Sequence, residues 1–373
     1  MKAIILTCNM GQGHNSAAKA IYEAMQRRNI ESEIVDALSF GGKHTSRLVS
    51  SSYVNITVKA PRAFGFLYKA GNCISSDKRK SPIYYVNKLY ADNLYEYIIK
   101  NEFDIIVTTH LFPGEALTYL KRKYNLTTKC YGVVTDYTCI PFWEELDMDI
   151  HFTPHADLND VYIGKGIPQE KIVPLGIPVS NRFAKKLEKN QARDCIGIPQ
   201  DCKMFLIMTG SMGFGNILNI VTELLRRSDQ NVRIVILVGR NKKLKNELIF
   251  NYPGDKRVVP VPFTDEVPIY MDACDVLLTK PGGLSSTEAA VKNVPIVHTM
   301  PIPGCETINA LFFSQHGISI MATTQEEAVE GALRLSESER ERQAMLNAQQ
   351  SVINSHAADD ICSYIAKIMC AEM

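Results

Sequence analysis

The 373-residue sequence lacks long apolar runs, paired cysteines and a dominant charge of one sign. No apolar run approaches the ~20 residues that a helix needs to cross a bilayer, so any contact with a membrane is expected to be peripheral. The ten cysteines stand singly, without a CxxC pair or a zinc-type Cys/His spacing, which indicates a reducing cytoplasm and no structural metal. A formal net charge of +1 disfavours a protein that binds nucleic acid through an overall basic surface.

The sequence also has no short internal repeat and no low-complexity segment. What remains is an ordinary globular composition, with 46% hydrophobic and 22% charged residues. A chain of this length exceeds what one hydrophobic core usually serves, so two domains are expected. The run Met1–Thr7 is too short for a secretory signal and leads into a glycine turn, and it therefore predicts a first strand.

Short β-branched runs alternate with amphipathic helical patterns in both halves of the chain, which is typical of parallel strands joined by helical crossovers. The predicted strands are 4–6, 33–36, 104–107, 131–134 and 149–152 in the first half, and 205–208, 234–238, 276–278 and 295–297 in the second. Between the halves, the sequence from Lys185 to Arg193 is polar and charged, and no buried-strand pattern returns before Phe205.

These patterns predict an α/β protein with two Rossmann-like, doubly wound domains that face each other across a cleft. We place an N-terminal domain at 1–180, a linker at 181–203, a C-terminal domain at 204–350 and a helix within 351–373 that packs back on the N-terminal domain. Ligands of such sheets bind outside the carboxyl ends of the strands, so the cleft is the expected active site.

A first glycine loop joins the first strand to the first helix at residues 8–16 and contains Gly11, Gly13 and His14. Free backbone N–H groups at such a helix start favour a negatively charged or electron-rich ligand. The loop partly matches a dinucleotide-binding fingerprint, but Ser16 replaces the third glycine. An NAD or FAD site and a purely structural turn therefore stay open as alternatives.

Two further loops stand at strand-to-helix junctions of the second half. Residues 209–216 include Ser211 and Gly213, and residues 279–288 carry paired glycines followed by three hydroxyl side chains. Backbone amides and hydroxyls at one helix N-terminus can hold a diphosphate without a metal. Glu288 lies one turn inside that helix, where it can accept hydrogen bonds from ribose hydroxyls or simply complement the helix dipole.

Together these segments resemble the monogalactosyldiacylglycerol synthase and processive diacylglycerol glucosyltransferase group of glycosyltransferase family 28. The resemblance covers nearly the whole chain. The segments that carry it are residues 11–14 with 17–18, 135–137 with 141–143, 152–155, 175–179, 209–216, 238–241, 280–290, and 301–306 with Asn309.

The resemblance implies a GT-B fold, a UDP-hexose donor bound mainly by the C-terminal domain, a lipid acceptor bound by the N-terminal domain, and inversion at the anomeric carbon. It implies that Glu288 binds the ribose and that Glu306 and Asn309 contact the hexose or another part of the donor, while Arg240 and Phe263 lie near the uracil. The expected diphosphate cradle consists of Gly282, Gly283, Ser285 and Ser286, and the other glycine loops add Gly13, Ser211 and Gly213 as donor-binding residues.

Direct displacement requires a base that takes the proton of the acceptor hydroxyl. We expect His14 to be this base, because an imidazole at a helix start stays neutral near pH 7; it could instead only bind the lipid or the diphosphate. Asp136, at the end of a predicted strand, could orient His14, replace it or only close a turn. The mechanism calls for no cofactor and no metal.

The sequence between Gly41 and Ala91 is basic and aromatic, with one acid, Asp77. This composition suits an anionic membrane surface, although a solvated helical face over ordinary core aromatics would also give it. The residues predicted to contact the membrane or the acceptor are Arg62, Phe64, Phe66, Lys78, Arg79 and Lys80.

The sequence thus predicts a cytoplasmic enzyme, peripheral on the inner face of the cell membrane, that transfers a hexose from a UDP-sugar to the hydroxyl of diacylglycerol or of a glycosyl-diacylglycerol. Glucose is favoured over galactose as the hexose. The alternatives are a transferase for an undecaprenyl-linked acceptor, a UDP-sugar epimerase, and a non-catalytic sensor of lipid or nucleotide.

Overall fold

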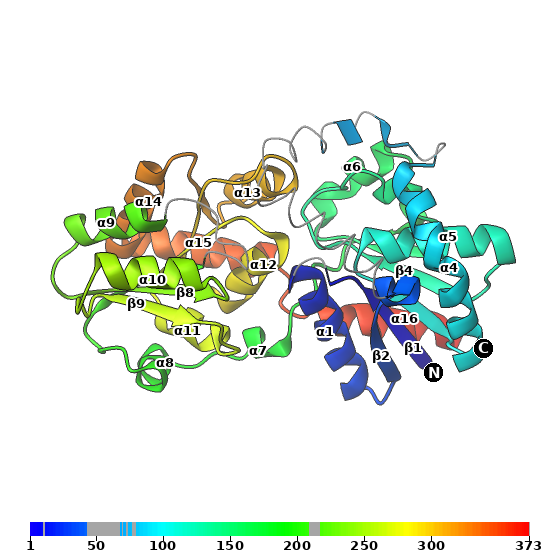
Figure 1. Cartoon of the computed structure of the whole chain (residues 1–373), viewed down its shortest axis with the longest axis horizontal. Helices are drawn as coiled ribbons and strands as arrows, with labels where there is room; N and C mark the ends of the chain where they lie inside the picture. The colour runs from blue at the N-terminus through cyan, green and yellow to red at the C-terminus, as the bar shows by residue number, and fades with distance from the viewer. Residues whose placement is uncertain are drawn as a thin grey trace. The chain divides into compact units, whose positions relative to one another are not determined.

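The computed structural model of the chain describes residues 1–9, 12–42, 68, 70–71, 74–76, 80–208 and 217–372. The chain divides into two compact units, shown in Figure 1. Unit 1 consists of Met1–Ser180, Pro303–Cys305 and Asn354–Met373, and unit 2 consists of Asn181–Ile302 and Glu306–Ile353.

Unit 1 is built on a parallel sheet of six strands in the order β2-β1-β3-β4-β5-β6. Strands buried on both faces read as continuous apolar runs, and Ile4, Ile5 and Leu6 of β1 are all fully buried. The strands are β1 (Lys2–Thr7), β2 (Glu31–Asp36), β3 (Ile105–Thr108), β4 (Lys129–Val133), β5 (Ile150–Phe152) and β6 (Ile172–Val173). The helices of this unit are α1 (Gln12–Arg27), α4 (Pro82–Asn101), α5 (Leu111–Tyr124), α6 (Asn159–Gly164) and α16 (Ala357–Glu372), with short 3-10 turns at Ala37–Gly41, Trp143–Glu145, Ala156–Leu158 and Gln169–Lys171.

The last helix of the chain, α16, belongs to the core of unit 1. Its apolar residues Ile361 and Ile365 pack in one cluster with Ile21 of α1 and with β1, β3 and β4. At the edge of this contact, Asp359 forms ion pairs with Arg27 (2.9 Å) and Arg28 (2.6 Å). The contact between α1 and α16 is therefore mainly apolar, with ion pairs at its edge.

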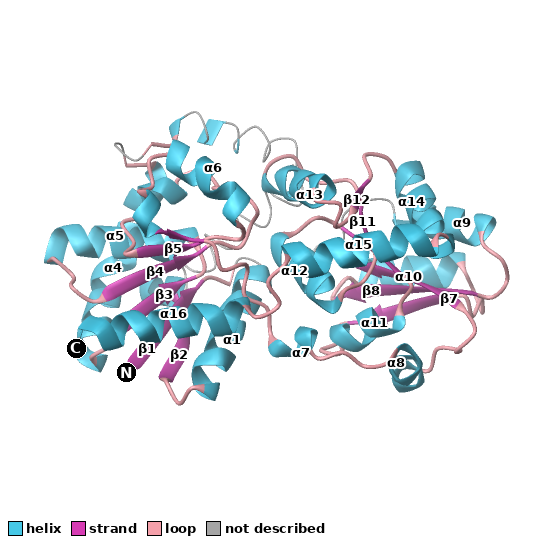
Figure 2. Cartoon of the chain, turned by 180° about the vertical axis from the view of Figure 1, so that it is seen from behind, coloured by secondary structure: helices cyan, strands magenta, loops and turns pink. Residues whose placement is uncertain are grey.

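Unit 2 repeats the same plan with a parallel sheet in the order β12-β11-β10-β7-β8-β9 (Figure 2). Its strands are β7 (Lys203–Met208), β8 (Val232–Gly239), β9 (Val258–Pro262), β10 (Val276–Thr279), β11 (Ile296–His298) and β12 (Ile320–Met321). Its helices are α7 (Asn181–Ala184), α8 (Lys189–Ile196), α9 (Ile217–Arg227), α10 (Lys242–Asn251), α11 (Val267–Ala273), α12 (Gly283–Lys292), α13 (Cys305–Gln315), α14 (Gln325–Glu337) and α15 (Glu339–Val352). The predicted fold class, α/β with two doubly wound parallel sheets, is confirmed.

The strand orders locate one switch point in each sheet, where ligands of doubly wound folds bind. In unit 1, β1 lies between β2 and β3, and in unit 2, β7 lies between β8 and β10. The segments after β1 and β3, and those after β7 and β10, therefore meet at the carboxyl ends of their sheets. Among the described residues, no helix is both long and apolar enough to cross a membrane.

Candidate active site

His14 lies in the first turn of α1, at the switch point of the unit 1 sheet. Its Nδ1 lies 2.8 Å from the carbonyl oxygen of Thr109, which follows β3, and 3.0 Å from the hydroxyl of Thr135, which follows β4. The Thr109 hydroxyl in turn donates to the backbone carbonyl of His14 at 3.1 Å. Three segments that are distant in sequence thus fix one partly buried imidazole.

These bonds decide which nitrogen of His14 carries the proton. A carbonyl oxygen only accepts, so Nδ1 must carry the hydrogen that it donates to Thr109. In the neutral ring, Nε2 then keeps its lone pair. Burial lowers the pKa of His14, partly opposed by the bond to Thr109, and the ring stays neutral near pH 7. A neutral imidazole with a fixed accepting nitrogen is the group that a general base requires.

Asp136 follows Thr135 and is partly buried. Its charge acts on two phenols: burial, with nearby groups that include Asp136, raises the pKa of Tyr68 and that of Tyr162. Among the described residues, the bonds that orient His14 come from Thr109 and Thr135. The Thr109 carbonyl and the Thr135 hydroxyl thus hold His14, and the role of Asp136 stays a prediction.

In unit 2, the loop after β10 leads into α12 through Gly282, the N-cap residue. Gly282 has no side chain with which to cap this helix end, and a Cβ atom added to it would meet open space. The first intrahelical bond is donated by the Ser286 N–H to Gly282, which leaves the N–H groups of Gly283 and Ser285 at the helix start. This end of α12 has the donors that an anion needs.

Ser286 does not fit the predicted cradle. Its side chain is fully buried, and its hydroxyl lies 2.9 Å from Nε2 of His298 at the end of β11, whose Nδ1 is 3.0 Å from the Ser319 hydroxyl. Because adjacent residues on a helix point in different directions, Ser286 faces the sheet while Ser285 stays partly exposed. We therefore leave Ser286 out of the cradle, and Gly282, Gly283 and Ser285 remain.

Glu288 lies in the second turn of α12 and is partly exposed at its surface. Burial of the carboxyl group raises its pKa to about 8. Without a ligand, much of this carboxyl is protonated near neutral pH. Hydrogen bonds donated by ribose hydroxyls would stabilise the ionised carboxylate and lower its pKa again.

Glu306 and Asn309 lie on α13 and are both buried. One Glu306 oxygen pairs with Lys280 at 2.6 Å, and the other accepts from the Ile302 N–H at 3.1 Å. The Asn309 amide donates to the Pro281 carbonyl at 3.0 Å. Glu306 and Asn309 thus both bind the loop before α12. Lys280 adds a cation to this loop, and the sequence analysis had given it no role.

Arg240 and Phe263 follow two neighbouring strands, β8 and β9. The Arg240 guanidinium lies 5.3 Å from the centre of the Phe263 ring, which is 55% exposed. An exposed aromatic ring beside a planar cation offers a face on which a base can stack. The sequence separation of the two residues had given no indication of this contact.

Several predicted site residues lie outside the described part of the chain, namely Arg62, Phe64, Phe66, Lys78, Arg79, Ser211 and Gly213. Gly13 is described and lies in α1 directly before His14. Lys80 is partly buried: its ammonium donates to the Glu145 carbonyl at 2.8 Å and lies 5.4 Å from the centre of the Tyr84 ring. Burial, followed by the charge of Arg122, lowers the pKa of Lys80.

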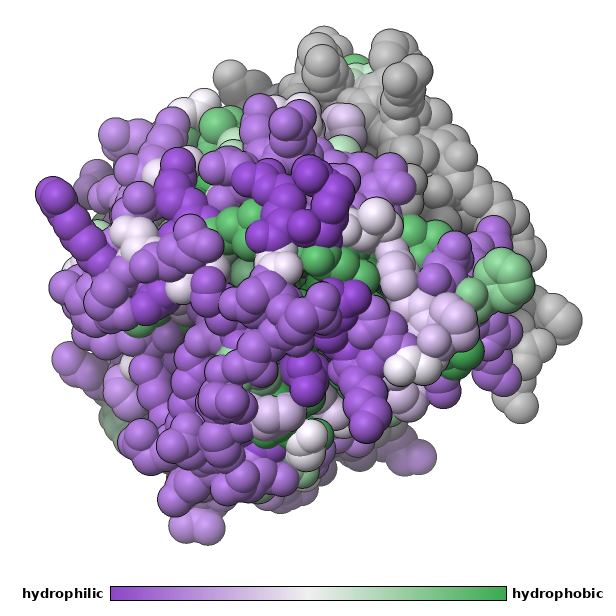
Figure 3. Space-filling model, turned by 90° about the vertical axis from the view of Figure 1, so that its left-hand side faces the viewer, coloured by the Kyte–Doolittle hydropathy of each residue, from purple (hydrophilic) through white to green (hydrophobic). Residues whose placement is uncertain are grey.

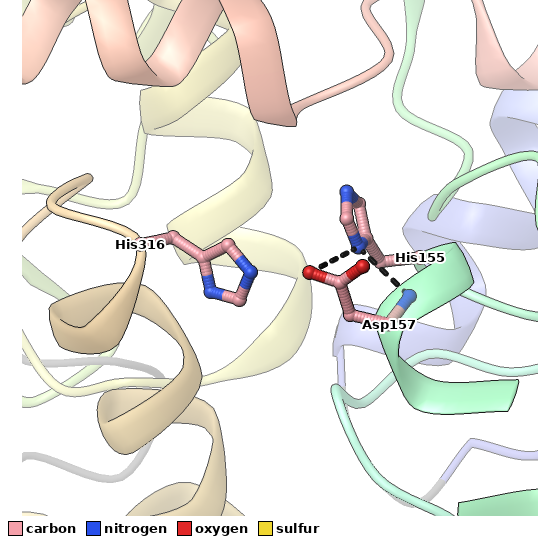
Figure 4. A group of neighbouring side chains, drawn as sticks. All are labelled: His155, Asp157 and His316. Atoms are coloured by element: carbon pink, nitrogen blue, oxygen red, sulfur yellow. Dashed lines mark hydrogen bonds and ion pairs between the residues drawn. The ribbon is translucent and has the colours of Figure 1, made fainter. Parts of the chain in front are cut away.

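A second histidine of unit 1, His155, shows how an imidazole can cap a turn (Figure 4). Its Nδ1 accepts from the backbone N–H of Asp157 at 3.2 Å, and the Asp157 carboxylate lies 3.6 Å away. His155 lies in a segment that carried the family resemblance.

Comparison with known proteins gives two family matches. Residues 14–179 match the monogalactosyldiacylglycerol (MGDG) synthase family, and residues 204–362 match the glycosyltransferase family 28 C-terminal domain. A curated relative from Bacillus cytotoxicus, named processive diacylglycerol beta-glucosyltransferase, is 26% identical over 368 residues, which are 98% of this chain and 93% of the relative.

Solved structures show the same fold at lower identity. MurG from Acinetobacter baumannii aligns with a TM-score of 0.63 at 14% identity, over 98% of this chain and all of that one (100%). UDP-GlcNAc 2-epimerase from Neisseria meningitidis, bound to UDP-GlcNAc, aligns with a TM-score of 0.64 at 16% identity, over 98% and 100% of the two chains.

Two doubly wound sheets with loop sites at their switch points define a protein of the GT-B class. The chain belongs to glycosyltransferase family 28, with an N-terminal half of the MGDG synthase type.

Proposed function

We propose that this protein transfers a hexose from a UDP-sugar to the free hydroxyl of diacylglycerol, with inversion at the anomeric carbon. The new bond joins the acceptor oxygen to C1 of the hexose, and the bond between C1 and the diphosphate oxygen breaks. UDP leaves with the electron pair, and the hydroxyl proton passes to Nε2 of His14. The observation that carries the proposal is the tautomer of His14, held by Thr109 and Thr135 with Nε2 free to accept.

The donor belongs to unit 2 in this proposal. The start of α12 binds the diphosphate through the N–H groups of Gly283 and Ser285, beside the open space at Gly282, and Lys280 adds positive charge. Glu288 accepts from the ribose, and the uracil stacks beside Arg240 and Phe263. Glu306 and Asn309 hold the loop and reach the hexose. We favour glucose, which is the sugar in the names of the relatives from Bacillus and Staphylococcus.

The acceptor reaches unit 1 from a membrane surface, and we place the enzyme on the inner face of the cell membrane. Helix α4 presents three exposed apolar residues, the adjacent Tyr85 (59% exposed) and Val86 (45%), and Leu89 (76%) one turn later. The exposed Lys88 lies among them, and Lys80 precedes the helix. Apolar residues flanked by lysines fit an anionic interface. By contrast, the side of the molecule that carries α9 and α14 is mostly hydrophilic (Figure 3).

The test is product formation by the full-length protein on diacylglycerol vesicles, with UDP-glucose and UDP-galactose supplied in turn. We expect hexosyl-diacylglycerol with a β-linkage, identified by mass and by the coupling constant of the anomeric proton. Vesicles that carry an undecaprenyl-linked acceptor form a second arm. Product in that arm alone, or conversion of the UDP-sugar without any lipid, would contradict the proposal.

A further inference from the structure

A buried histidine, His110, lies against the His14 ring. His110 follows β3 and is the N-cap residue of α5, and 7% of it is exposed. The centres of the two imidazole rings are 4.5 Å apart, and the rings meet edge to face at 73°. The mechanism proposed above uses His14 and leaves His110 without a part.

The bonds of His110 fix a tautomer opposite to that of His14. Its Nδ1 accepts from the backbone N–H of Phe112 at 3.1 Å, so Nδ1 carries no proton and the neutral ring has its hydrogen on Nε2. In His14 the hydrogen is on Nδ1, donated to Thr109. The two rings are thus held by backbone groups of one segment, the carbonyl of Thr109 and the N–H of Phe112, and neither can turn over without losing its bond.

We propose that His110 is a positioning residue for His14: its ring holds the plane of the His14 imidazole and keeps water from it, so that His14 remains a neutral acceptor at Nε2. This inference rests on the proposed role of His14 as the base. His110 acts through His14 and makes no contact with substrate in this scheme.

The charged and titratable groups around His14 support this role. The first turn of α1 contains no acidic residue, the segment after β3 brings His110, and the segment after β4 brings Asp136 beside Thr135. Burial lowers the pKa of His110 well below its ordinary value, and a charge on His14 lowers it further. Burial therefore favours the neutral form of both rings, and of His110 the more strongly.

The discriminating variant is His110→Asn, because asparagine is a preferred N-cap residue and can still accept from the Phe112 N–H. It removes the ring and admits water to His14. We expect the pKa of His14 to rise by about half a unit or more, since desolvation of its charged form is relieved. The acidic limb of the kcat/KM profile should move to higher pH by the same amount, while KM for the UDP-sugar stays within about twofold.

His14 can be titrated directly by NMR of the ring-labelled protein without substrate, so this readout survives even if the proposed reaction is wrong. His155→Asn is the matched control, because it replaces another imidazole cap of unit 1 and should leave the His14 titration unchanged. If His110→Asn does not fold, His110→Gln serves in its place. An unchanged His14 titration in the folded variant, or a loss of activity equal at all pH values, would overturn the inference.

Discussion

The proton on Nδ1 of His14 is the single-residue feature on which the proposed chemistry of unit 1 depends. Thr109 accepts it through a backbone carbonyl, which no side-chain substitution removes, and Thr135 adds a hydroxyl at 3.0 Å. The same logic holds for metal-binding histidines, in which the bond made by one nitrogen sets the role of the other.

Replacement of His14 by alanine should lower turnover by about 10²–10⁴, because general-base catalysis contributes rates of that order. UDP affinity, measured by calorimetry, should stay nearly unchanged, since UDP binds to unit 2 in the proposal. Thr135→Val keeps the Thr109 bond and should cost less than His14→Ala. A His14→Ala enzyme that loses UDP binding while the remaining turnover is normal would make His14 a donor ligand instead.

Glu288 predicts a proton-coupled step in donor binding. Its pKa is raised to about 8 in the free protein, and hydrogen bonds from the ribose should lower it. UDP binding should therefore release protons below pH 8, and affinity should rise as the pH rises toward 8 and then level off. Calorimetry in buffers of different ionisation enthalpy counts these protons.

The control for this step is Glu288→Gln, which removes the carboxyl group. Any protons exchanged by the phosphates of UDP are still counted with this variant. It should release fewer protons and bind UDP more weakly by ~1–3 kcal/mol. Folding stability depends on pH in the opposite direction. Because the pKa of Glu288 in the folded protein is raised from 4.5 to about 8, the free energy of unfolding falls as the pH rises through this range. Equal proton release by both proteins would show that Glu288 does not meet the nucleotide.

At the scale of elements, α12 carries the proposed diphosphate site at its N-terminus and a buried ion pair at its C-terminus. Lys292, near the end of α12, bonds Asp272 of α11 at 2.5 Å, and their side chains are 1% and 4% exposed. Lys292 also donates to the Lys185 carbonyl. The pair ties α12 to α11 within unit 2.

Asp272→Ala should lower the free energy of unfolding of unit 2 by ~3–5 kcal/mol, because it leaves the Lys292 charge buried without its partner. Urea unfolding measures this loss in the transition that UDP shifts to higher urea concentration. The control is Glu247→Ala, which removes an exposed pair with Lys243 and should cost less than about 1 kcal/mol. Equal losses in both variants would contradict the account of α12.

The strands of both sheets could be predicted where they are buried on both faces. Nine predicted runs correspond to β1–β5, β7, β8, β10 and β11, with ends that differ by one or two residues. The edge strands β6 and β12 have two residues each and carry no periodicity, and β9 contains two prolines and is half exposed, so neither type gives a buried apolar run.

The candidate site was predictable where a loop follows a strand and much less so where partners come from elsewhere in the chain. Loop position alone brought His14, Gly282 and Glu288 into consideration. The partners of His14 are a carbonyl and a hydroxyl from two other strand ends, and no local pattern marks them. Ser286 was misjudged because its direction depends on the turn of α12, which places it toward His298.

At the scale of the whole molecule, we propose that unit 2 binds the donor and that unit 1 contacts the membrane. Leu89→Glu should reduce binding to anionic vesicles about tenfold or more, because one large apolar side chain contributes about 1.5–3 kcal/mol on burial. Flotation measures the effect. Phe250→Glu is the control, since Phe250 is also an exposed apolar residue (84%) but lies on α10 of unit 2, and it should bind as the wild type does. Equal loss in both variants would place the contact elsewhere.

The central claim is that transfer couples the departure of UDP to the glycosylation of a lipid hydroxyl. One measurement tests it: released UDP and lipid-bound hexose are quantified in the same sample of wild-type enzyme, UDP-glucose and diacylglycerol vesicles. The account predicts equal amounts of both, no UDP release without diacylglycerol, and a parallel loss of both with His14→Ala. UDP released without lipid product, or a UDP-sugar isomerised in the absence of lipid, would contradict it.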